Sequence, residues 1–492
     1  MDIKIKNKKL YLVGPIVAVV ATAVILTITL FVSPYVGMED NGDFSRVIYN
    51  EGLFDLQENS ELLYNGYFIK EYGIINYYNE YSHTVYTSQF LFIQPAIWLD
   101  KLFTGNDDVF DLRFLGFVMM IYFLIVLYFF ADYLTHKLSL VSSLIITASC
   151  IFVFADTGYI AYLNSFYAEP VAYVSLMACI TCALLYADGR YNKYTVLAGF
   201  VINGAILTFS KQQFAPIGAL LSIMGLLFYL KAQGRLFKWL IAISSAALLL
   251  AGIFNYLLIS AEFTNINMFH SMTRGALMTS DNPPETLESF GIDDQYELLN
   301  KNIYFDRYPV IHSEDDMLQE NFYSKYNIFS IMKYYVQNPN SFFEMLKFGA
   351  LNAYRIRPEI GTYEYSAGYP PNTLAQTFSL YSNAKSNYTP KTTGFIIIWT
   401  ILGLALLYKK RMKQMIILGL IIIGYSQIVV SIIGAGDADF AKHVFLYNVA
   451  YDMVNVILLA HVISFFDRKY KDKRYKKAQI LEDIDDALYK NI

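Results

Sequence analysis

The sequence predicts an all-α membrane protein whose chain crosses the bilayer about ten times. Hydrophobic residues make up 55% of the 492 residues and charged residues only 16%, whereas a soluble protein usually carries about a quarter charged residues. Several apolar runs reach about 20 residues, the length that a helix needs to cross the hydrocarbon core of a bilayer. Lys and Arg cluster between these runs, which is typical of short loops on the cytoplasmic side of a membrane.

The apolar runs give the predicted spans in order. The first run, at about 10–32, is too long for the core of a cleavable signal peptide and lacks a small-residue cleavage site, so we expect it to remain as the first helix. The other spans are expected near 114–134, 138–154, 170–187, 194–209, 214–230, 238–259, 393–408, 414–434 and 443–466.

The positions of Lys and Arg orient these spans. Lys4, Lys6, Lys8 and Lys9 precede the first span, and further basic residues occur at 136–137, 190–193, 231–238, 409–413 and after Phe466. Since cytoplasmic loops are enriched in Lys and Arg, we place both termini in the cytoplasm. The segments expected outside are then 34–113, 155–169, 210–213, 260–392 and 435–442.

The apolar stretch at 86–103 is the one ambiguous segment. It is short, and Gln89, Gln94 and Pro95 interrupt it. Counting it as a crossing would place every later basic cluster outside, against the positive-inside rule. We therefore expect an interfacial or re-entrant helix here.

Four regions follow from this topology. Residues 1–259 form an N-terminal transmembrane module, whose first outer loop is 34–113, and residues 260–392 form a large extracytoplasmic segment. Residues 393–466 form the C-terminal transmembrane helices, and 467–492 a charged cytoplasmic tail. Within the large segment, alternation of apolar and polar residues over 329–354, broken by Asn338-Pro339, suggests two amphipathic helices on the outer surface.

The most informative polar cluster follows the first span and contains Asp40, Asn41-Gly42, Asp43 and Arg46. Asn-Gly is a turn signal, or Asn41 caps a short helix with Asp43 in its first turn. Arg46 lies on the same face as Asp43 and could orient it or bind a phosphate. The structural alternative is a polar cap where a helix leaves the membrane.

Two further clusters lie in the predicted outer segments. Asn164, Tyr167 and Glu169 precede a span and offer the amide, hydroxyl and aromatic groups found on sugar-binding surfaces, although Glu169 could simply stabilise a helix N-terminus. Lys211 and Gln212 occupy a tight turn between two spans. Lys211 could hold a phosphate as a point charge or extend toward lipid headgroups.

The last cluster contains Asp437, Lys442 and His443 in another short outer turn. Asp452 follows within the final span, where an ionisable residue marks either a functional site or a polar contact between helices. Arg355 is a further candidate for a phosphate clamp, with a solvated surface residue as the alternative. The three cysteines all lie in apolar runs and show no ligand spacing. The sequence therefore supports no cofactor and no metal site, with a divalent metal left as the alternative.

An acid in the first outer loop of a polytopic scaffold with a large outer segment resembles the GT-C superfamily of glycosyltransferases. Asn41-Gly42-Asp43-Phe44-x-Arg46 and the later Gly436-Asp437 with Lys442-His443 are similar to bacterial hexose transferases that modify cell-surface glycans. The resemblance implies a polyprenyl-phosphate-linked monosaccharide donor, a glycan acceptor outside the bacterial plasma membrane, and a catalytic base at Asp43 or Asp40. It implies no nucleic-acid partner.

Two other classes remain open at this point. A glycan polymerase or ligase would share the topology and use a lipid-linked oligosaccharide. A flippase or transporter of lipid-linked sugar would be the non-enzymatic alternative, and it would favour repeats and a polar path through the membrane.

Overall fold

The computed structural model describes residues 12–79, 86–407 and 411–489. The N-terminal lysines, Lys409 and Lys410, on which part of the predicted topology depends, lie outside these ranges. Ten helices form a bundle at the positions of the predicted spans: α2 (Val13–Phe31), α5 (Arg113–Thr135), α6 (Leu140–Phe154), α8 (Glu169–Asp188), α9 (Lys193–Phe209), α10 (Ala215–Leu226), α11 (Arg235–Leu257), α18 (Thr393–Leu406), α19 (Arg411–Ala435) and α21 (Phe445–Tyr489).

Within the described residues, seven helices are long and apolar enough to cross a membrane, counting α10 together with the 3₁₀ turns on either side of it, η3 (Gln212–Phe214) and η4 (Leu227–Lys231). Two bent pairs raise this to as many as nine: α6 with 157–163, and α17 (Leu380–Tyr388) with α18. Helix α9 is apolar but shorter. The protein is therefore a mostly helical, multi-pass membrane protein, and a total of ten crossings stays a prediction.

Local sequence signals explain where several helices begin and end. The Ser139 side chain accepts a hydrogen bond from the backbone of Ser142 at the start of α6, and Asn192 caps α9 in the same way. Gly189 ends α8 in the left-handed conformation, which glycine adopts without steric cost.

Helix α8 is the centre of the bundle. In its most apolar stretch 94% of residues are buried, against 28% for α11, which lies at the periphery with an apolar outer surface. A helix that is apolar on all sides is expected to be surrounded by protein or lipid. Helices α5, α9, α19 and α21 pack around α8. The first and last residues of α8 therefore lie at the two ends of the bundle.

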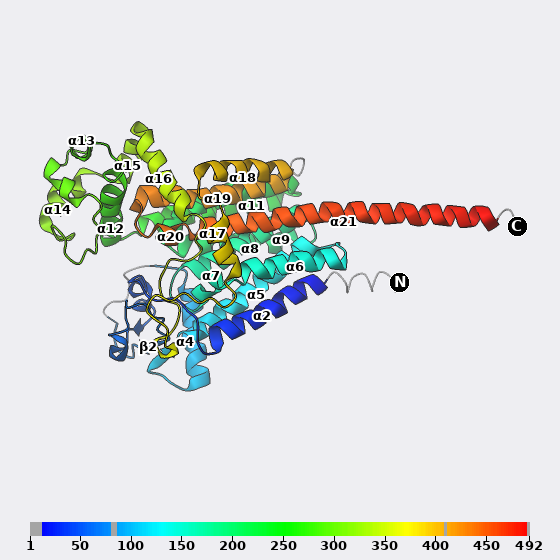
Figure 1. Ribbon diagram of the computed structural model, residues 1–492, viewed down its shortest axis with the longest axis horizontal. Helices are drawn as coiled ribbons and strands as arrows, with labels where there is room; N and C mark the ends of the chain where they lie inside the picture. Colours follow the sequence, from blue (N-terminus) through cyan, green and yellow to red (C-terminus); the bar gives the residue numbers. More distant parts are fainter. Residues whose placement is uncertain (1–11, 80–85, 408–410, 490–492) are drawn as a thin grey trace.

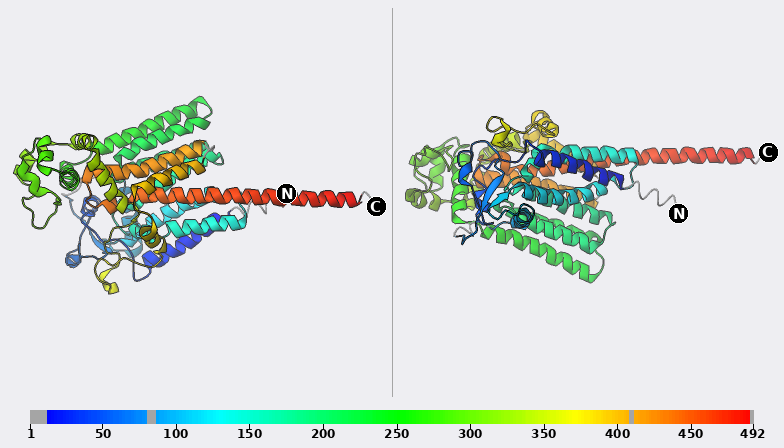
Figure 2. Two further views of the ribbon diagram at one scale, coloured as in Figure 1. Left: turned by 45° about the horizontal axis from the view of Figure 1, so that its top comes forward. Right: turned by 90° about the horizontal axis from the view of Figure 1, so that it is seen from below.

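Both termini lie at one end of the bundle, and the first outer loop and the large segment lie at the other (Figure 1). The further views in Figure 2 show the same separation, with α21 extending well beyond the bundle on the side of the termini. This agrees with the predicted grouping of segments, while the assignment of the two ends to cytoplasm and exterior stays a prediction.

The first outer loop contains a small sheet that the sequence did not predict. Strands β1 (Leu53–Phe54), β2 (Glu71–Ile74) and β3 (Val109–Asp111) pair antiparallel in the order β1-β2-β3. Their two to four residues are too short for a recognisable alternation. The loop also contains α3 (Ser45–Ile48) and α4 (Phe90–Thr104), the latter in the stretch expected to be interfacial.

Helix α4 buries Phe92, Ile93 and Ile97 and exposes Trp98 and Phe103, by 63% and 73%. Its 15 residues span only about 22 Å, less than the roughly 30 Å of a hydrocarbon core. A one-sided apolar surface of this length suits a helix lying in the membrane interface.

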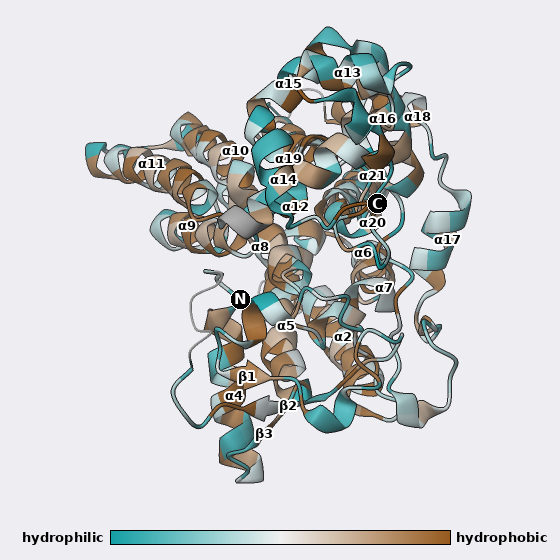
Figure 3. Ribbon diagram, turned by 90° about the vertical axis from the view of Figure 1, so that its left-hand side faces the viewer, coloured by the Kyte–Doolittle hydropathy of each residue, from teal (hydrophilic) through white to brown (hydrophobic). Residues whose placement is uncertain are grey.

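The large segment forms its own helical cap with a separate hydrophobic core that includes Met272, Phe322 and Met345. Its elements are α12 (Ala261–Ser271), the π-helical turn η5 (Met272–Ala276), α13 (Pro283–Ser289), η6 (Asp294–Leu299), α14 (Asp316–Asn321), η7 (Tyr323–Lys325), α15 (Ile328–Gln337) and α16 (Pro339–Asn352). Helices α15 and α16 are the predicted amphipathic pair, separated at Asn338-Pro339. Figure 3 shows these cap helices as more hydrophilic than the bundle behind them.

The end of the large segment does not stay with the cap. Helix α17 packs beside α6 (Figure 1). Its Lys385 Nζ lies 2.8 Å from Asp452 Oδ1 in α21. Tyr159 and Tyr381 donate hydrogen bonds to the same carboxylate, each at 2.5 Å. Asp452 is thus a buried polar contact between elements, the structural alternative considered for it from the sequence.

Candidate functional site

The turn at Asp40–Asp43 positions the first acidic cluster. Asp40 Oδ1 accepts hydrogen bonds from the backbone of Gly42 at 2.7 Å and of Phe44 at 3.1 Å. Gly42 has a φ of 101°, a conformation that residues with a Cβ rarely adopt. The sequence therefore forms a turn here, and α3 begins just after Asp43.

Asp43 forms an ion pair with Lys442 of α20 (Phe440–His443), 399 residues away in the sequence. Arg46 Nη2 lies 3.2 Å from the other oxygen of Asp43. The Lys442 side chain is 3% exposed and that of Asp43 18%. Two clusters recognised separately in the sequence are therefore one charged site.

The environment gives the two acids different protonation behaviour. Burial would raise the pKa of Asp43, but the positive charges of Lys442, Arg46 and Lys211 outweigh burial and hold it below its usual range. Burial dominates at Asp40 and raises its pKa to about 7, despite the backbone hydrogen bonds that it accepts. Asp43 is ionised at neutral pH, while Asp40 is partly protonated.

Glu169, at the start of α8, forms the second ion pair of the site. Its Oε1 lies 2.9 Å from Lys211 Nζ, and the side chain is 2% exposed. Its Oε2 is buried and accepts no hydrogen bond from any described residue. A buried carboxylate oxygen without a partner costs free energy, so this oxygen is available to accept a hydrogen bond from a bound hydroxyl group.

A pocket lies between these two ion pairs, lined by Asp43, Arg46, Val47, Thr87, Gln89, Phe166, Tyr167, Ala168, Glu169, Ser210, Lys211 and Gln212. Its free volume is about 40 Å³, little more than one water molecule occupies in the liquid. A sugar can enter only if some of the side chains that close the pocket move.

Hydrogen bonds between chain segments hold the pocket together. Gln89 donates from Nε2 to the carbonyl oxygens of Phe166 and Tyr167, at 2.7 and 3.1 Å. Thr87 donates to Ser210 O, and Gln213 to His443 O, at 2.9 and 2.8 Å. No local pattern in the sequence predicted these contacts. Gln89 could have been found from its position as a polar interruption of an apolar run.

Tyr167 lines the pocket, and His443 follows Lys442 in α20. The Tyr167 hydroxyl donates to Glu39 O and accepts from the backbone N–H of Asn41, which fixes the acidic turn against the start of α8. Lys442 Nζ lies 5.5 Å from the centre of the Tyr167 ring, within range of a cation–π contact. Burial and the charges of Lys211 and Lys442 lower the pKa of His443 to about 3, so it is neutral.

Five predicted binding residues are not among those that line this pocket. Lys442 and His443 adjoin it, through the ion pair with Asp43 and the hydrogen bond from Gln213, and the other three are Asn164, Arg355 and Asp437. Asn164 is fully buried and donates to Leu30 O and Val36 O, so it holds the end of α2 in place. Arg355 pairs with the exposed Glu359 at 3.3 Å. Asp437 pairs with Arg274. The Asn164 amide nitrogen, the Arg355 guanidinium and the Asp437 carboxylate thus have partners outside the pocket, and a binding role for these three residues stays a prediction.

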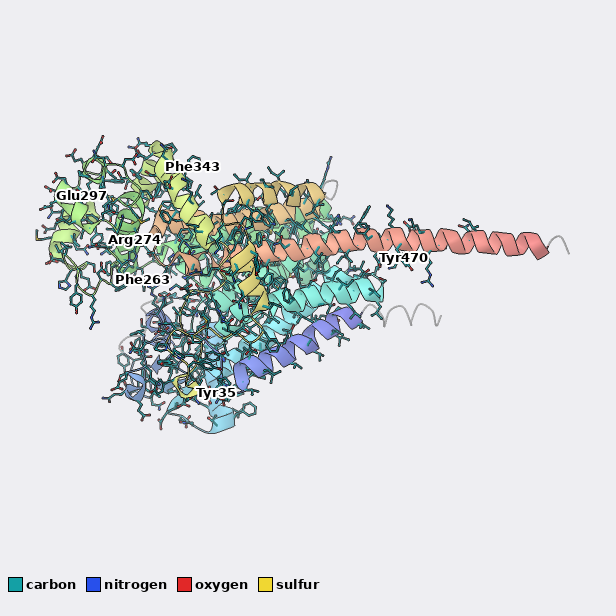
Figure 4. All side chains as sticks on the ribbon, in the orientation of Figure 1. Tyr35, Phe263, Arg274, Glu297, Phe343 and Tyr470 are labelled. Carbon is teal, nitrogen blue, oxygen red and sulfur yellow. The ribbon has the colours of Figure 1, made fainter. Side chains whose placement is uncertain are left out.

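The pair between Asp437 and Arg274 joins the helical cap to the bundle. Arg274 donates to both oxygens of Asp437, at 2.6 and 2.8 Å. Nearby, the Arg46 guanidinium lies 4.3 Å from the centre of the Phe263 ring in α12. Figure 4 labels Arg274 and Phe263 at the end of the molecule opposite Tyr470, the end that carries the site. The helical cap therefore contacts Arg46, which forms an ion pair with Asp43.

Within the described ranges, no group of three or more His, Cys, Asp or Glu side chains is arranged to hold a metal ion. The charged groups of the site are instead two carboxylates and three cations from separate segments. A buried set of this kind can bind an anion and move a proton.

Fold and site together define a multi-pass membrane protein with a charged pocket at the end of its bundle opposite the termini. A family model, the YfdI N-terminal transmembrane domain, matches residues 2–482. The chain belongs to this family. No curated protein and no solved structure matches the chain.

Proposed function

We propose that the protein is a membrane-embedded glycosyltransferase of GT-C type. It transfers a hexose from a polyprenyl-phosphate-linked monosaccharide to a glycan acceptor outside the cytoplasmic membrane of a bacterium. The observation that supports this most is the convergence of Asp43, Arg46, Glu169 and Lys211, from widely separated segments, around one pocket, with Lys442 paired to Asp43.

The ion pairs suit a phosphate-bearing donor. The donor phosphate competes with Asp43 for Lys442 and Arg46, and with Glu169 for Lys211. Once the cations contact phosphate, the pocket widens and the pKa of Asp43 rises, because the charges that depress it are partly neutralised. The acid then becomes a stronger base only when the donor is bound.

In the reaction, the acceptor hydroxyl attacks the anomeric carbon of the donor and gives its proton to Asp43. The bond between that carbon and the phosphate oxygen breaks, and its electron pair stays on the departing polyprenyl phosphate. Lys442, Arg46 and Lys211 stabilise the charge that develops there. Direct displacement inverts the anomeric centre. The free oxygen of Glu169 accepts a hydrogen bond from a sugar hydroxyl.

Asp40 fits the role of base less well. Its pKa near 7 suits a general base, but one of its oxygens accepts two backbone hydrogen bonds and the other is buried. It does not line the pocket. Geometry therefore favours Asp43, and Asp40 shapes the turn that carries it.

The test is transfer of label from radioactive polyprenyl-phosphate hexose to glycan in membranes containing the protein. We expect Asp43→Asn to reduce transfer by about 10²–10⁴-fold, the usual contribution of a general base. Asp439→Asn is the matched control, since it removes an exposed carboxylate 3.5 Å from the same Lys442. Asparagine also tolerates the left-handed conformation of residue 439.

Each outcome discriminates between functions. Near-normal transfer by a folded Asp43→Asn protein would remove Asp43 from the reaction. Label transfer only from a lipid-linked oligosaccharide would indicate a polymerase or ligase. Movement of the lipid-linked sugar across the membrane without glycan labelling would indicate a flippase. Thermal unfolding of each variant shows whether lost activity reflects lost structure.

A further inference from the structure

A second, larger pocket lies at the opposite end of the bundle, between α5, α8, α19 and α21. Its free volume is about 500 Å³. Residues from the four helices and from their connections line it: Tyr133, Leu134, His136, Lys137, Leu138, Leu184, Asp188, Arg190, Leu407, Lys413, Ile417, Ile457, Ala460, His461, Ser464, Arg468 and Lys471. The proposed transfer reaction uses none of them.

The polar part of this pocket has an excess of positive charge. Five Lys or Arg side chains line it, with one carboxylate, Asp188. Arg190 pairs with Asp132 and Asp188, Lys413 lies 3.7 Å from Asp188, and Lys471 pairs with Asp467. Even with those two further carboxylates counted, cations outnumber acids.

Lys137 and Arg468 account for the excess. Neither forms an ion pair with any residue in the described part of the chain. Lys137 is exposed, and its carbonyl oxygen accepts a hydrogen bond from Lys471 Nζ at 3.0 Å, which holds the connection after α5 against α21. Arg468 is exposed one turn before Lys471 and donates only to Ser464 O in its own helix. The ammonium group of Lys137 and the guanidinium group of Arg468 are therefore free to bind an anion.

Seven apolar residues also line the pocket, Leu134, Leu138, Leu184, Leu407, Ile417, Ile457 and Ala460, beside the uncharged polar side chains of Tyr133 and Ser464 and the imidazoles of His136 and His461. A soluble anion would gain nothing from such walls, whereas an amphipathic molecule buries hydrocarbon against them. The combination of unpaired cations and apolar side chains in one pocket selects a ligand with a phosphate group on an acyl or prenyl chain.

The length of α8 gives the depth of this pocket in the membrane. Glu169 of the first site and Asp188 of the second are the first and last residues of the helix. Twenty residues span about 30 Å, which matches the thickness of a bilayer hydrocarbon core. The two pockets therefore lie at opposite faces of the membrane.

We propose that this pocket binds the phosphate headgroup of an anionic membrane lipid in the leaflet opposite Asp43. Lys137 and Arg468 contact the phosphate, and the lipid chains lie against the apolar walls between α5 and α21. Basic pockets between transmembrane helices recognise lipid headgroups in this way. The bound lipid ties the connection after α5 to α21.

The experiment uses the purified full-length protein, titrated with acyl-labelled phosphatidylglycerol in phosphatidylcholine nanodiscs and followed by fluorescence anisotropy. The test variant is Lys137→Asn with Arg468→Gln, asparagine being chosen because residue 137 has a φ of 62°. We expect about fivefold weaker binding for each cation removed. The matched control is Lys469→Gln with Lys473→Gln, which removes two exposed charges of α21 outside the pocket.

Binding that is weakened in the test variant and unchanged in the control supports the proposal. Equal weakening in both would show attraction to the general surface charge and would overturn it. Displacement of the label by phosphatidylcholine as well as by unlabelled phosphatidylglycerol would also overturn it, as would displacement by inorganic phosphate alone. Competition on the wild-type protein gives a result even if the variant does not fold.

Discussion

The ion pair between Lys385 and Asp452 allows a quantitative prediction that does not depend on the proposed function. The two side chains are 2% and 0% exposed. The Asp452 carboxylate accepts hydrogen bonds from Lys385, Tyr159 and Tyr381, and Lys385 Nζ also lies 5.1 Å from the centre of the Tyr451 ring. The charges are thus paired and hydrogen-bonded, the condition for burying them.

Removing one partner leaves the other charge buried without compensation. Asp452→Asn and Lys385→Met should each lower the free energy of unfolding by about 3–5 kcal/mol, the usual effect of breaking a buried pair. The double variant removes both charges, so it should lower the free energy of unfolding by no more than either single variant does. The coupling between the two positions should then be at least about 3 kcal/mol.

The assay is unfolding in mixed micelles, followed by tryptophan fluorescence. Trp399 packs against Tyr451, with 4.6 Å between ring centres, and donates to Asn455 in the same helix as Asp452. It therefore reports the environment of the pair. The reasoning would be refuted if the losses of unfolding free energy in the two single variants added up in the double variant. It would also be refuted if each loss were below about 1 kcal/mol, because exposed or weakly coupled pairs give such values.

Two further predictions concern turns at the site. Gly436→Ala should markedly lower the midpoint temperature of thermal unfolding, because Gly436 has a φ of 59° and a Cβ would lie 2.5 Å from the backbone of Arg274. The control is Gly434→Ala, which should leave that temperature unchanged, because a Cβ at this position meets nothing within 4 Å. The free energy of unfolding of Asp40→Asn, relative to that of the wild type, should increase as pH rises from about 4 to 7. The raised pKa of Asp40 means that its neutral form stabilises the fold, and this stability is lost as pH rises through about 7; parallel unfolding curves at all pH values would contradict this.

Much of the helical architecture could be predicted from the sequence. Apolar runs of bilayer length can form only helices, because every backbone polar group in lipid must be paired within its own segment. The predicted spans therefore coincide with observed helices, and the break at Asn338-Pro339 separates α15 from α16. Lys and Arg grouped the connections into two sets, which the structure places at opposite ends of the bundle.

The sequence also identified Asp43, Arg46, Glu169, Lys211 and Lys442 as candidates, but could not pair them. Asp43 and Lys442 are 399 residues apart, and only the packing of α20 against the first outer loop brings them together. The same limitation applies to Asn164, Arg355 and Asp437, whose partners the sequence did not indicate. Their polar groups are used by partners such as Arg274, which no local pattern indicates.

Hydropathy and charge alone therefore determined that the chain forms membrane helices and which connections share an end of the bundle, because those properties depend on the solvent that each segment meets. Only the tertiary structure decided which acid faces which cation, that α17 packs beside the bundle, and that a basic pocket opens at the far end. These features depend on distances between segments that are far apart in the chain, and such distances cannot be read from local patterns of residues.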